Sequence, residues 1–434
     1  MVGNESRPVK KVLMVAYHFP PLAGSSGIQR TLRFVQHLPK FGWEPIVLSA
    51  NPRAYERTGD DLMDEVPEGT IVKRSFALDT ARHLSLGGRY MASMARPDRW
   101  ISWKFAGVYD GLRLIERYKP DVIWSTYPIA TAHLIGAELH RRTGLPWVTD
   151  FRDPMAQDNY PADLVIRRQF REIEAHAVRH AVLSFVTTPG AARICRERYP
   201  DMAERILVLE NGYDEESFEN AEKLLVGREP LIPGAVTLLH SGIVYPSERD
   251  PTALFVALQY LKERGDVQAG RFKIRFRAAV HDAMLNALAK SHGVEGFIET
   301  CPPFAYREAL SEMLRADGLL LMQASNCNEQ IPAKIYEYLR AHRPILGLTD
   351  PSGDTAGVLR SAGVSKIAAL DSPKAIGELI LALFQKEIEQ LKPDDEAVTT
   401  ASRHRRAQFL AQHLHGISDR IAEGGDGFQK VRSP

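Results

Sequence analysis

The stretch CNEQIPAKIYEYLRAHRPILGL, residues 327–348, places a loop, a helix and an apolar run in close succession. Pro332 lacks an N–H group and is favoured in the first turn of a helix, while the residue before it is pushed out of helical geometry. We therefore expect a helix from near Pro332 to about Ala341, followed by the strand RPILGL. Glu329 then lies in the loop before this helix, and Glu337 lies more than one turn inside it.

The same alternation of apolar runs and helical segments continues on both sides of this stretch. The strands KVLMVAY and DVIWST, for example, are separated by helical periodicity, and the helix IATAHLIGAELHRRTG follows the second of them. Repeated strand–helix–strand units predict an α/β fold with parallel, doubly wound sheets. The predicted strands cover residues 11–17, 44–50, 121–126, 146–151, 183–188, 206–212, 235–242, 271–280, 296–300, 318–323 and 343–348.

The pattern breaks near Asn211-Gly212 and restarts after a polar linker. A chain of 434 residues is also too long for one ordinary hydrophobic core. We therefore expect two Rossmann-like domains facing a cleft, residues 1–207 and 208–401, with ligands bound at the carboxyl ends of their strands. An amphipathic helix over 402–422 is expected to pack back towards the first domain.

The composition is that of a globular protein without a membrane span or a disulfide framework. Hydrophobic residues make up 44% of the chain and charged residues 25%, and no run of about 18 apolar residues occurs. The N-terminal apolar run is too short for a secretory signal, and the three cysteines lie far apart. These features predict a cytoplasmic protein with free thiols, and no metal-ligand spacing is present. Residues 1–205 hold 29 Lys and Arg against 23 Asp and Glu, which suggests contact with anions unless the bias is incidental.

The predicted helix start suggests what the two glutamates do. A helix N-terminus offers unpaired N–H groups and a partial positive charge, and anionic phosphates bind such ends readily. One carboxylate on each side would accept hydrogen bonds from hydroxyl groups. A nucleotide sugar has this form, with a diphosphate between a sugar and a ribose, and Lys334 would add positive charge there. The alternative is that both glutamates are solvated charges on a surface helix.

Several other segments carry recognisable motifs. They are PPLAGSSGIQR (20–30), WVTDFRDP (147–154), ENGYD (210–214), HSGIVY (240–245) and KIYEYLRAHRPILGL (334–348). Together with the E-x7-E spacing of Glu329 and Glu337, they resemble, in order, the motifs of the family-4 retaining glycosyltransferases of the GT-B fold. The similarity is to members from bacterial polysaccharide and glycoconjugate biosynthesis, and it spans roughly residues 10–350 and the terminal helix.

This resemblance implies roles for residues of the predicted second domain. Glu329 would hold hydroxyl groups of the donor sugar and act in catalysis, while Glu337 would hold the ribose. The main-chain N–H groups of Gln330 and Ile331 would lie near the sugar or a phosphate. The remaining positions implied to bind the donor are Gly242, Arg249 and Lys334.

In the predicted first domain, the resemblance implies a glycine-rich loop whose backbone approaches the diphosphate or the acceptor. The loop consists of Gly24, Ser25, Ser26 and Gly27. A tight turn with no ligand is the alternative. Asp150, Arg152 and Asp153 stand at the end of a strand and are further catalytic candidates that would meet acceptor hydroxyls. An Asp–Arg ion pair that fixes this loop is the other interpretation, and the two are compatible.

Two positions of the second domain depart from the family pattern. Family members have an Arg directly after the loop glycine and a Lys about six residues later, where this chain has Ile243 and Arg249. One phosphate-neutralising charge is therefore missing, and a guanidinium replaces an ammonium. Either the donor geometry differs, or another cation such as Lys334 or Arg30 compensates.

The sequence therefore predicts a metal-independent hexosyltransferase that moves a sugar from a nucleotide-diphosphate donor to a glycan or lipid-linked acceptor with retention. No separate cofactor and no nucleic-acid partner are expected. The alternatives are a GT-B nucleotide-sugar epimerase or hydrolase, and a non-catalytic nucleotide-sugar-binding protein of the same fold. The segment RYMASMARPDRWISWKF (89–105) suggests peripheral contact with the inner face of the membrane, or else a helix packed against the first domain.

Overall fold

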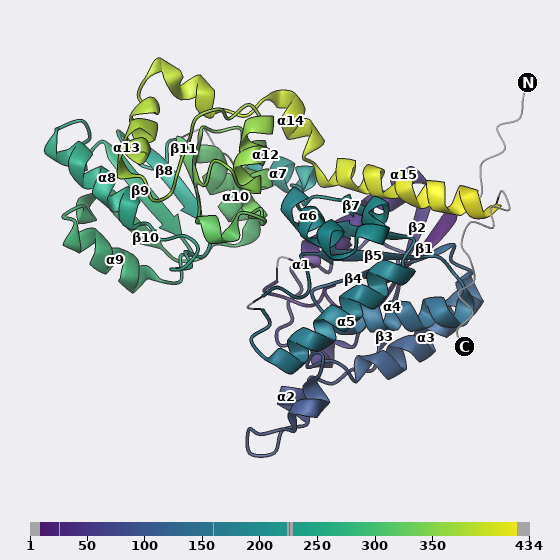
Figure 1. Cartoon of the computed structure of the whole chain (residues 1–434). Helices are drawn as coiled ribbons and strands as arrows, with labels where there is room; N and C mark the ends of the chain where they lie inside the picture. The colour runs from purple at the N-terminus through teal and green to yellow at the C-terminus, as the bar shows by residue number, and fades with distance from the viewer. Residues whose placement is uncertain (1–8, 26, 159, 224, 226–228, 423–434) are drawn as a thin grey trace, which may run out of the picture. The chain divides into compact units, whose positions relative to one another are not determined.

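The computed structural model describes residues 9–422 apart from 26, 159, 224 and 226–228 (Figure 1). The chain folds into two compact units. One contains the chain up to Glu210 together with the chain from His404 onward, and the other is Asn211–Arg403. Each unit is a parallel sheet flanked by helices, which confirms the predicted fold class of two Rossmann-like, doubly wound sheets.

The first unit is built on a seven-stranded sheet in the order β3-β2-β1-β4-β5-β6-β7. The chain adds strands outward from β1 to β3, then returns and continues outward from β4 on the other side. This reversal places the carboxyl ends of β1 and β4 side by side at the switch point, where ligands bind in sheets of this kind. The strands are β1 (Lys10–Val15), β2 (Trp43–Ala50), β3 (Ile71–Ser75), β4 (Val122–Thr126), β5 (Trp147–Arg152), β6 (Leu183–Val186) and β7 (Ile206–Val208).

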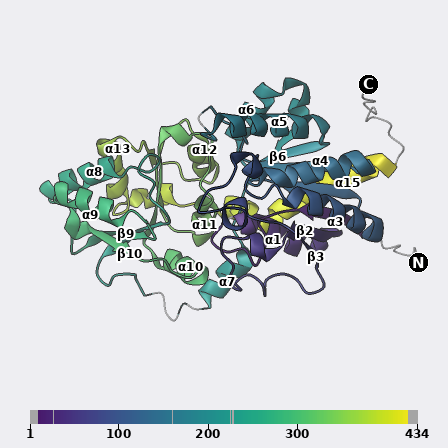
Figure 2. The same ribbon diagram turned by 90° about the horizontal axis from the view of Figure 1, so that it is seen from below.

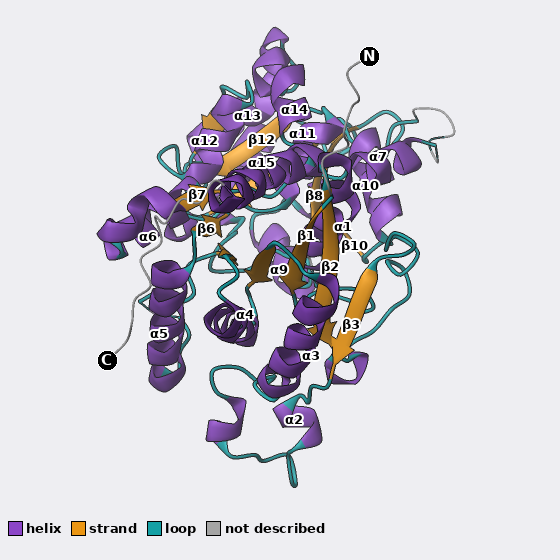
Figure 3. Ribbon diagram, turned by 90° about the vertical axis from the view of Figure 1, so that its right-hand side faces the viewer, coloured by secondary structure: helices purple, strands orange, loops and turns teal. Residues whose placement is uncertain are grey.

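Helices cover both faces of this sheet because successive side chains of a strand point to opposite sides. Leu13 and Val15 pack into the core beneath α3, α4 and α5, which Figure 3 shows as a row, whereas Val12 and Met14 pack into the core beneath α1. The helices are α1 (Gly27–His37), α2 (Thr80–His83), α3 (Trp103–Tyr118), α4 (Ala130–Thr143), α5 (Leu164–His180) and α6 (Pro189–Arg198).

The last helix, α15 (Arg403–Ala422), belongs to the core of the first unit. Its apolar side chains share one cluster with α1 and with the buried rings of Trp43 and Trp124. His415 adds a polar contact, because its Nε2 lies 2.9 Å from the carbonyl oxygen of Phe41. The α15 residues in the cluster are Ala407, Leu410, Ala411, Leu414 and Ile417.

The second unit has a six-stranded sheet in the order β10-β9-β8-β11-β12-β13, so its switch point lies between β8 and β11. Figure 2 shows α8, α9 and α13 grouped on one face and α7, α10 and α11 on the other. The strands are β8 (Val236–Ser241), β9 (Phe272–Arg277), β10 (Ile298–Cys301), β11 (Gly318–Gln323), β12 (Ile345–Thr349) and β13 (Ile367–Ala368). The helices are α7 (Glu215–Glu222), α8 (Thr252–Glu263), α9 (Asp282–Ser291), α10 (Tyr306–Arg315), α11 (Lys334–Ala341), α12 (Asp354–Ser361), α13 (Pro373–Ala382) and α14 (Asp395–Thr400).

Two edge strands, β3 and β13, are additions to the strands predicted from the sequence. β3 reads IVKRS and is only partly buried, and β13 has two residues, so neither produces the apolar run by which a central strand is recognised. None of the helices in the described part of the chain is long and apolar enough to cross a membrane.

The packing of α15 leads to a stability prediction. Leu410→Ala is expected to lower the free energy of unfolding by about 2–5 kcal/mol, because it removes a fully buried side chain from the core under α1. Urea unfolding followed by circular dichroism measures the effect. Gln412→Ala, at an exposed position of the same helix, is the control and should change stability by less than about 0.5 kcal/mol. Wild-type stability of Leu410→Ala would show that α15 does not stabilise the first unit.

Candidate functional site

The residues predicted from the sequence gather at the switch point of each sheet. In the second unit, β8 runs into Gly242, and β11 runs into the loop that carries Glu329 and leads to α11. In the first unit, β1 runs towards the glycine-rich loop before α1, and β5, the neighbour of β4, runs into Asp153. The doubly wound topology therefore explains why segments far apart in the sequence form two local sites, one in each unit.

At the end of β8 in the second unit, the backbone of Gly242, which has no side chain, lies next to the ammonium group of Lys334. Gly242 has a φ of +110°, and a Cβ there would lie 3.2 Å from the Nζ of Lys334. The strand end is held in place because the Ser241 N–H donates to the hydroxyl of Tyr338 at 3.0 Å. Lys334 is the first residue of α11, so its charge lies at the N-terminal end of that helix.

His240 fixes the other side of this ammonium group. Its Nδ1 lies 2.9 Å from the carbonyl oxygen of Leu320, which only accepts, so Nδ1 carries the proton. In the neutral ring Nε2 is then an acceptor, and it faces the Nζ of Lys334 at 3.2 Å. Burial and the charges of Lys334 and Arg249 hold the pKa of His240 well below its usual range, so the ring stays neutral. Burial and Arg249 likewise lower the pKa of Lys334 to about 7.

Glu337 lies on the same helix, with its carboxylate tied to a tyrosine. The hydroxyl of Tyr306, at the start of α10, donates to Oε1 of Glu337 at 2.8 Å. Burial raises the pKa of the Glu337 carboxyl, while the hydrogen bond from Tyr306 and the nearby charges of Arg403 and Lys334 oppose that rise. The structure thus brings together Gly242, Lys334 and Glu337.

The start of α11 differs slightly from the prediction. The helix begins at Lys334 rather than near Pro332, so Glu337 lies in its first turn instead of beyond it. The reason is a tight turn ahead of the helix, in which the Ile335 N–H donates to the carbonyl oxygen of Pro332 at 3.0 Å. Glu329 is exposed in the loop between β11 and this turn.

The loop itself uses one of the N–H groups expected to meet the ligand. The Gln330 N–H donates to the carbonyl oxygen of Cys327 at 2.9 Å, and its own carbonyl oxygen accepts from Gln323 and Thr355. The Gln330 N–H is therefore already bonded within the loop, and its expected place near the sugar or a phosphate stays a prediction. The Ile331 N–H forms no hydrogen bond with other described residues.

Arg249 closes the loop that follows Gly242. Its Nη1 donates to the carbonyl oxygen of Ile243 at 2.6 Å, and its guanidinium lies 5.2 Å from the ring centroid of Tyr245. Ile243 is half-buried and brings no charge to this loop. The cations near Gly242 are accordingly Lys334 on the helix and Arg249 on the loop.

In the first unit, Asp150 is fully buried and pairs with Arg30 rather than with Arg152. The Nε and Nη2 atoms of Arg30 lie 2.8 and 2.7 Å from the two carboxylate oxygens, and Thr126 donates a further hydrogen bond. Arg30 also donates to the carbonyl oxygens of Leu209 and Glu210. This pair joins α1 to the end of β5, so Arg30 is neutralised within the unit.

Arg152 has a strained backbone at the end of β5. Its φ is +66°, and the Asp153 N–H donates across it to the carbonyl oxygen of Phe151 at 2.8 Å, which makes a γ-turn. Thr187 holds this turn by donating both its N–H and its hydroxyl to the Arg152 carbonyl oxygen. A Cβ on Gly27 would lie 2.6 Å from Nη1 of Arg152, so the guanidinium lies against the start of α1.

The glycine-rich loop packs against the side chains of His18 and Arg152. Gly24 has a φ of +79°, and the Gly27 N–H donates to Ser25 Oγ at 3.2 Å. Ser25 Oγ also lies 3.2 Å from Nδ1 of His18, and a Cβ on Gly27 would overlap that ring at 2.3 Å. Burial and the charge of Arg152 lower the pKa of His18 to about 4. Ser26 lies outside the described residues.

Sequence reasoning missed three side chains of these sites: His18, His240 and Tyr306. The two histidines follow or end the first strand of their unit, and that position at a switch point is a usable signal. Tyr306 has no such signal, because 31 residues separate it from Glu337. Among the described residues, no three His, Cys, Asp or Glu side chains come together in a group able to hold a metal ion.

Comparison with known families agrees with this geometry. Residues 26–212 match the family model of the glycosyl transferase 4-like domain, a stretch that includes Gly27, Arg30, Asp150 and Arg152. Over these residues the first unit is similar to a glycosyl transferase 4-like domain. This finding confirms the resemblance on which the sequence-based prediction rests. No curated protein matches the chain at a significant level.

Solved structures share the GT-B fold along nearly the whole chain. A glycosyltransferase from Rickettsia africae ESF-5 has a TM-score of 0.63 at 13% identity, with 94% of this chain and 98% of that chain covered. Anabaena Alr3699/HepE, solved with UDP and glucose, has a TM-score of 0.56 at 14% identity, covering 96% and 100%. UDP-GlcNAc 2-epimerase from Neisseria meningitidis, bound to UDP-GlcNAc, has a TM-score of 0.53 at 12% identity, covering 94% and 100%.

The buried Arg30–Asp150 pair of the first unit leads to a prediction. Asp150→Asn should cost about 3–5 kcal/mol of stability, because it leaves the Arg30 guanidinium buried without its counter-charge. Differential scanning calorimetry measures the loss. Asp153→Asn, three residues along at an exposed position, should leave the melting temperature nearly unchanged. Equal melting temperatures of the two variants would contradict a structural role for Asp150.

Proposed function

We propose that the protein is a glycosyltransferase that moves a sugar from a nucleotide-diphosphate donor to a glycan or lipid-linked acceptor with retention. The observation that carries the proposal is the grouping of Gly242, Lys334 and Glu337 at the switch point of the second unit. It combines a bare backbone, a cation and a carboxylate, which are the groups needed for a diphosphate and a ribose.

The diphosphate of the donor is proposed to lie over Gly242 and the start of α11. A side chain at position 242 would meet the Lys334 ammonium group, so glycine leaves space for an anion there. Lys334 and Arg249 supply positive charge, and the helix end supplies N–H groups. In this proposal Lys334 replaces the charge that is lost with Ile243, because Arg30 is already paired with Asp150.

The sugar and the ribose are proposed to lie on opposite sides of the diphosphate. Glu337, oriented by Tyr306, would accept hydrogen bonds from ribose hydroxyls, and the exposed Glu329 would hold hydroxyls of the sugar. In transfer, the bond between the sugar C1 and the diphosphate oxygen breaks while the acceptor oxygen bonds to C1. The acceptor proton passes to a diphosphate oxygen, and Lys334 and Arg249 stabilise the negative charge that grows on the leaving group without a metal ion.

The acceptor is proposed to bind the first unit. Arg152 ends β5 and Asp153 follows it, next to the switch point, and the γ-turn holds both in a fixed direction. Asp150 positions this loop through Arg30 and does not itself reach an acceptor, because its carboxylate is fully buried. A lipid-linked acceptor would in addition require contact with a membrane surface.

Two findings on similar folds support nucleotide-sugar binding. Anabaena Alr3699/HepE was solved with UDP and glucose, and the Neisseria meningitidis epimerase with UDP-GlcNAc. The epimerase makes nucleotide-sugar epimerisation the second candidate function. Incubation with donor alone separates the two functions, because an epimerase converts the donor without an acceptor and a transferase requires one.

The two glutamates give a first test. Glu329→Ala is expected to lower kcat by about 100-fold or more, whereas Glu337→Ala should weaken UDP binding by about 10- to 100-fold. Isothermal titration calorimetry with UDP and a transfer assay over a donor panel measure the two effects. Glu308→Ala, an exposed glutamate of α10, is the control and should change neither. Wild-type rates and affinities in both site variants would remove the donor-site assignment.

The Lys334 ammonium group gives a second test. Its pKa of about 7 means that the free protein carries this charge at pH 6.5 and loses most of it by pH 8. A bound diphosphate favours the charged form, so the affinity for UDP should fall by about tenfold between those pH values. Lys334→Arg keeps its charge throughout and should bind UDP with little dependence on pH. The same pH profile for both proteins would show that Lys334 does not contact the diphosphate.

A further inference from the structure

Exposed apolar side chains of the described residues gather in one part of the first unit. Eighteen large apolar side chains are exposed, and seven of them fall within the 34 residues 76–109. Soluble proteins scatter such side chains singly, so a concentration of this kind marks a contact surface. The seven are Phe76, Leu84, Leu86, Tyr90, Met91, Phe105 and Tyr109.

The most exposed of these residues stands at the tip of a β-hairpin. Leu86 and Arg89 exchange both backbone hydrogen bonds, at 2.8 and 3.1 Å, around Gly87 and Gly88. Both glycines have positive φ angles, +58° and +77°, as a type I′ turn requires. The turn presents Leu86 at 90% exposure and, just beyond it, Met91 at 67%. The chain here follows a tight, regular turn that holds apolar side chains out in solvent.

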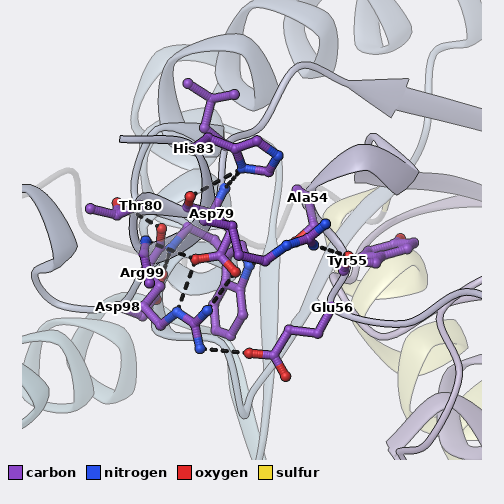
Figure 4. A network of polar contacts seen from close by, with 12 residues as sticks. Ala54, Tyr55, Glu56, Asp79, Thr80, His83, Asp98 and Arg99 are labelled. Carbon is purple, nitrogen blue, oxygen red and sulfur yellow. Dashed lines mark hydrogen bonds and ion pairs between the residues drawn. The ribbon is translucent and has the colours of Figure 1, made fainter. Parts of the chain in front are cut away.

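The base of the hairpin is anchored to the core by a polar network (Figure 4). Asp79 is fully buried, begins α2 by capping the Ala81 N–H, and accepts two hydrogen bonds from Arg99 at 2.9 and 2.6 Å. Thr80 donates to the carbonyl oxygens of Met94 and Arg99, each at 2.9 Å. The segments before and after the hairpin are therefore held together by hydrogen bonds, which fixes the position of the projecting tip.

A second exposed apolar segment adjoins the hairpin region. Arg96, which follows the 3-10 turn Ala92–Ala95, pairs with Asp163 at the start of α5 at 3.2 Å. The next two residues, Leu164 and Val165, are exposed, Leu164 to 72%. The Arg96–Asp163 pair thus joins the segment after the hairpin to the first turn of α5, where two further apolar side chains are exposed.

The charge around this surface is positive. Residues 80–119 hold eight Lys and Arg against three Asp and Glu. Of the eight, Arg96 pairs with Asp163 and Arg99 pairs with Asp79 and Glu56, and of the three acids Asp98 is turned inward to α4. Arg89 stands on the hairpin itself, and Arg168 is exposed one turn beyond Leu164. Apolar tips surrounded by basic side chains are complementary to an anionic lipid surface, where the tips enter the acyl boundary and the cations meet headgroups.

We propose that this surface, formed by the hairpin 84–91 and the start of α5, binds the protein peripherally to an anionic lipid bilayer. It inserts Leu86 and Met91 and places Arg89 and Arg168 at the headgroups. The inference deepens the proposed function, on which it rests only for the need to reach a lipid-linked acceptor. Its test does not use the donor site.

The test is flotation of the full chain with lipid vesicles. Wild-type protein should bind vesicles of phosphatidylcholine and phosphatidylglycerol, bind pure phosphatidylcholine more weakly, and lose affinity as salt is raised. Leu86→Ser with Met91→Ser should weaken binding to the mixed vesicles by about tenfold or more, because both side chains leave water on insertion. The control, Met63→Ser with Tyr260→Ser, removes two exposed apolar side chains elsewhere and should bind like wild type.

Three further readouts make the result decisive. The melting temperature of the hairpin variant should equal that of wild type, since the exposed side chains of Leu86 and Met91 make few packing contacts in the folded chain. Its affinity for UDP, measured without vesicles, should be unchanged, so failure of the lipid inference is distinguishable from failure of the donor assignment. Absence of vesicle binding by wild-type protein would overturn the inference. So would a wild-type dimer, detected by sedimentation, that the hairpin variant abolishes while vesicle binding remains.

Discussion

Burial of the Lys334 ammonium group beside the end of β8 is the constraint on which the second unit depends. A buried cation is costly unless other groups replace water around it. Here the neutral Nε2 of His240 replaces part of that water, and the absence of a side chain on Gly242 leaves one side of the ammonium group open. The remaining cost appears as the lowered pKa of Lys334. A bound anion would offset that cost, so the free unit is arranged to favour an anionic ligand.

The two units treat their buried cations in opposite ways, and this difference decides which of them is available to a phosphate. Arg30 shares a bidentate pair with a fully buried carboxylate and donates to two carbonyl oxygens, so its charge stabilises the first unit. Lys334 faces a neutral histidine instead, and the like charge of Arg249, together with burial, lowers its pKa. This difference supports the proposal that Lys334, rather than Arg30, supplies the charge lost with Ile243.

The fold followed from the sequence because central parallel strands are buried on both faces and read as apolar runs. β1, β4, β8 and β11 all appear in this way, whereas the edge strand β3 does not, since four of its five residues are partly or fully exposed. Some of the candidate site residues could also be predicted, because the ends of the strands and the proline before α11 can be recognised in the sequence. What the sequence did not contain was the pairing of distant side chains, such as Arg30 with Asp150 across 120 residues, and the internal use of the Gln330 N–H.

Backbone strain falls next to the switch points, at the ends of the strands that neighbour β4 and β8. Five non-glycine residues among those described have a positive φ, and two of them, Lys119 and His342, simply end helices. The other three, Arg152, Ala278 and Val280, follow or end β5 and β9 at their carboxyl ends. A β-branched residue such as Val280 adopts this conformation only when its surroundings hold it there, at a cost of about 1–3 kcal/mol. At Arg152 the two hydrogen bonds from Thr187 hold the strained turn, which sets its side chains in directions that a relaxed strand end would not give.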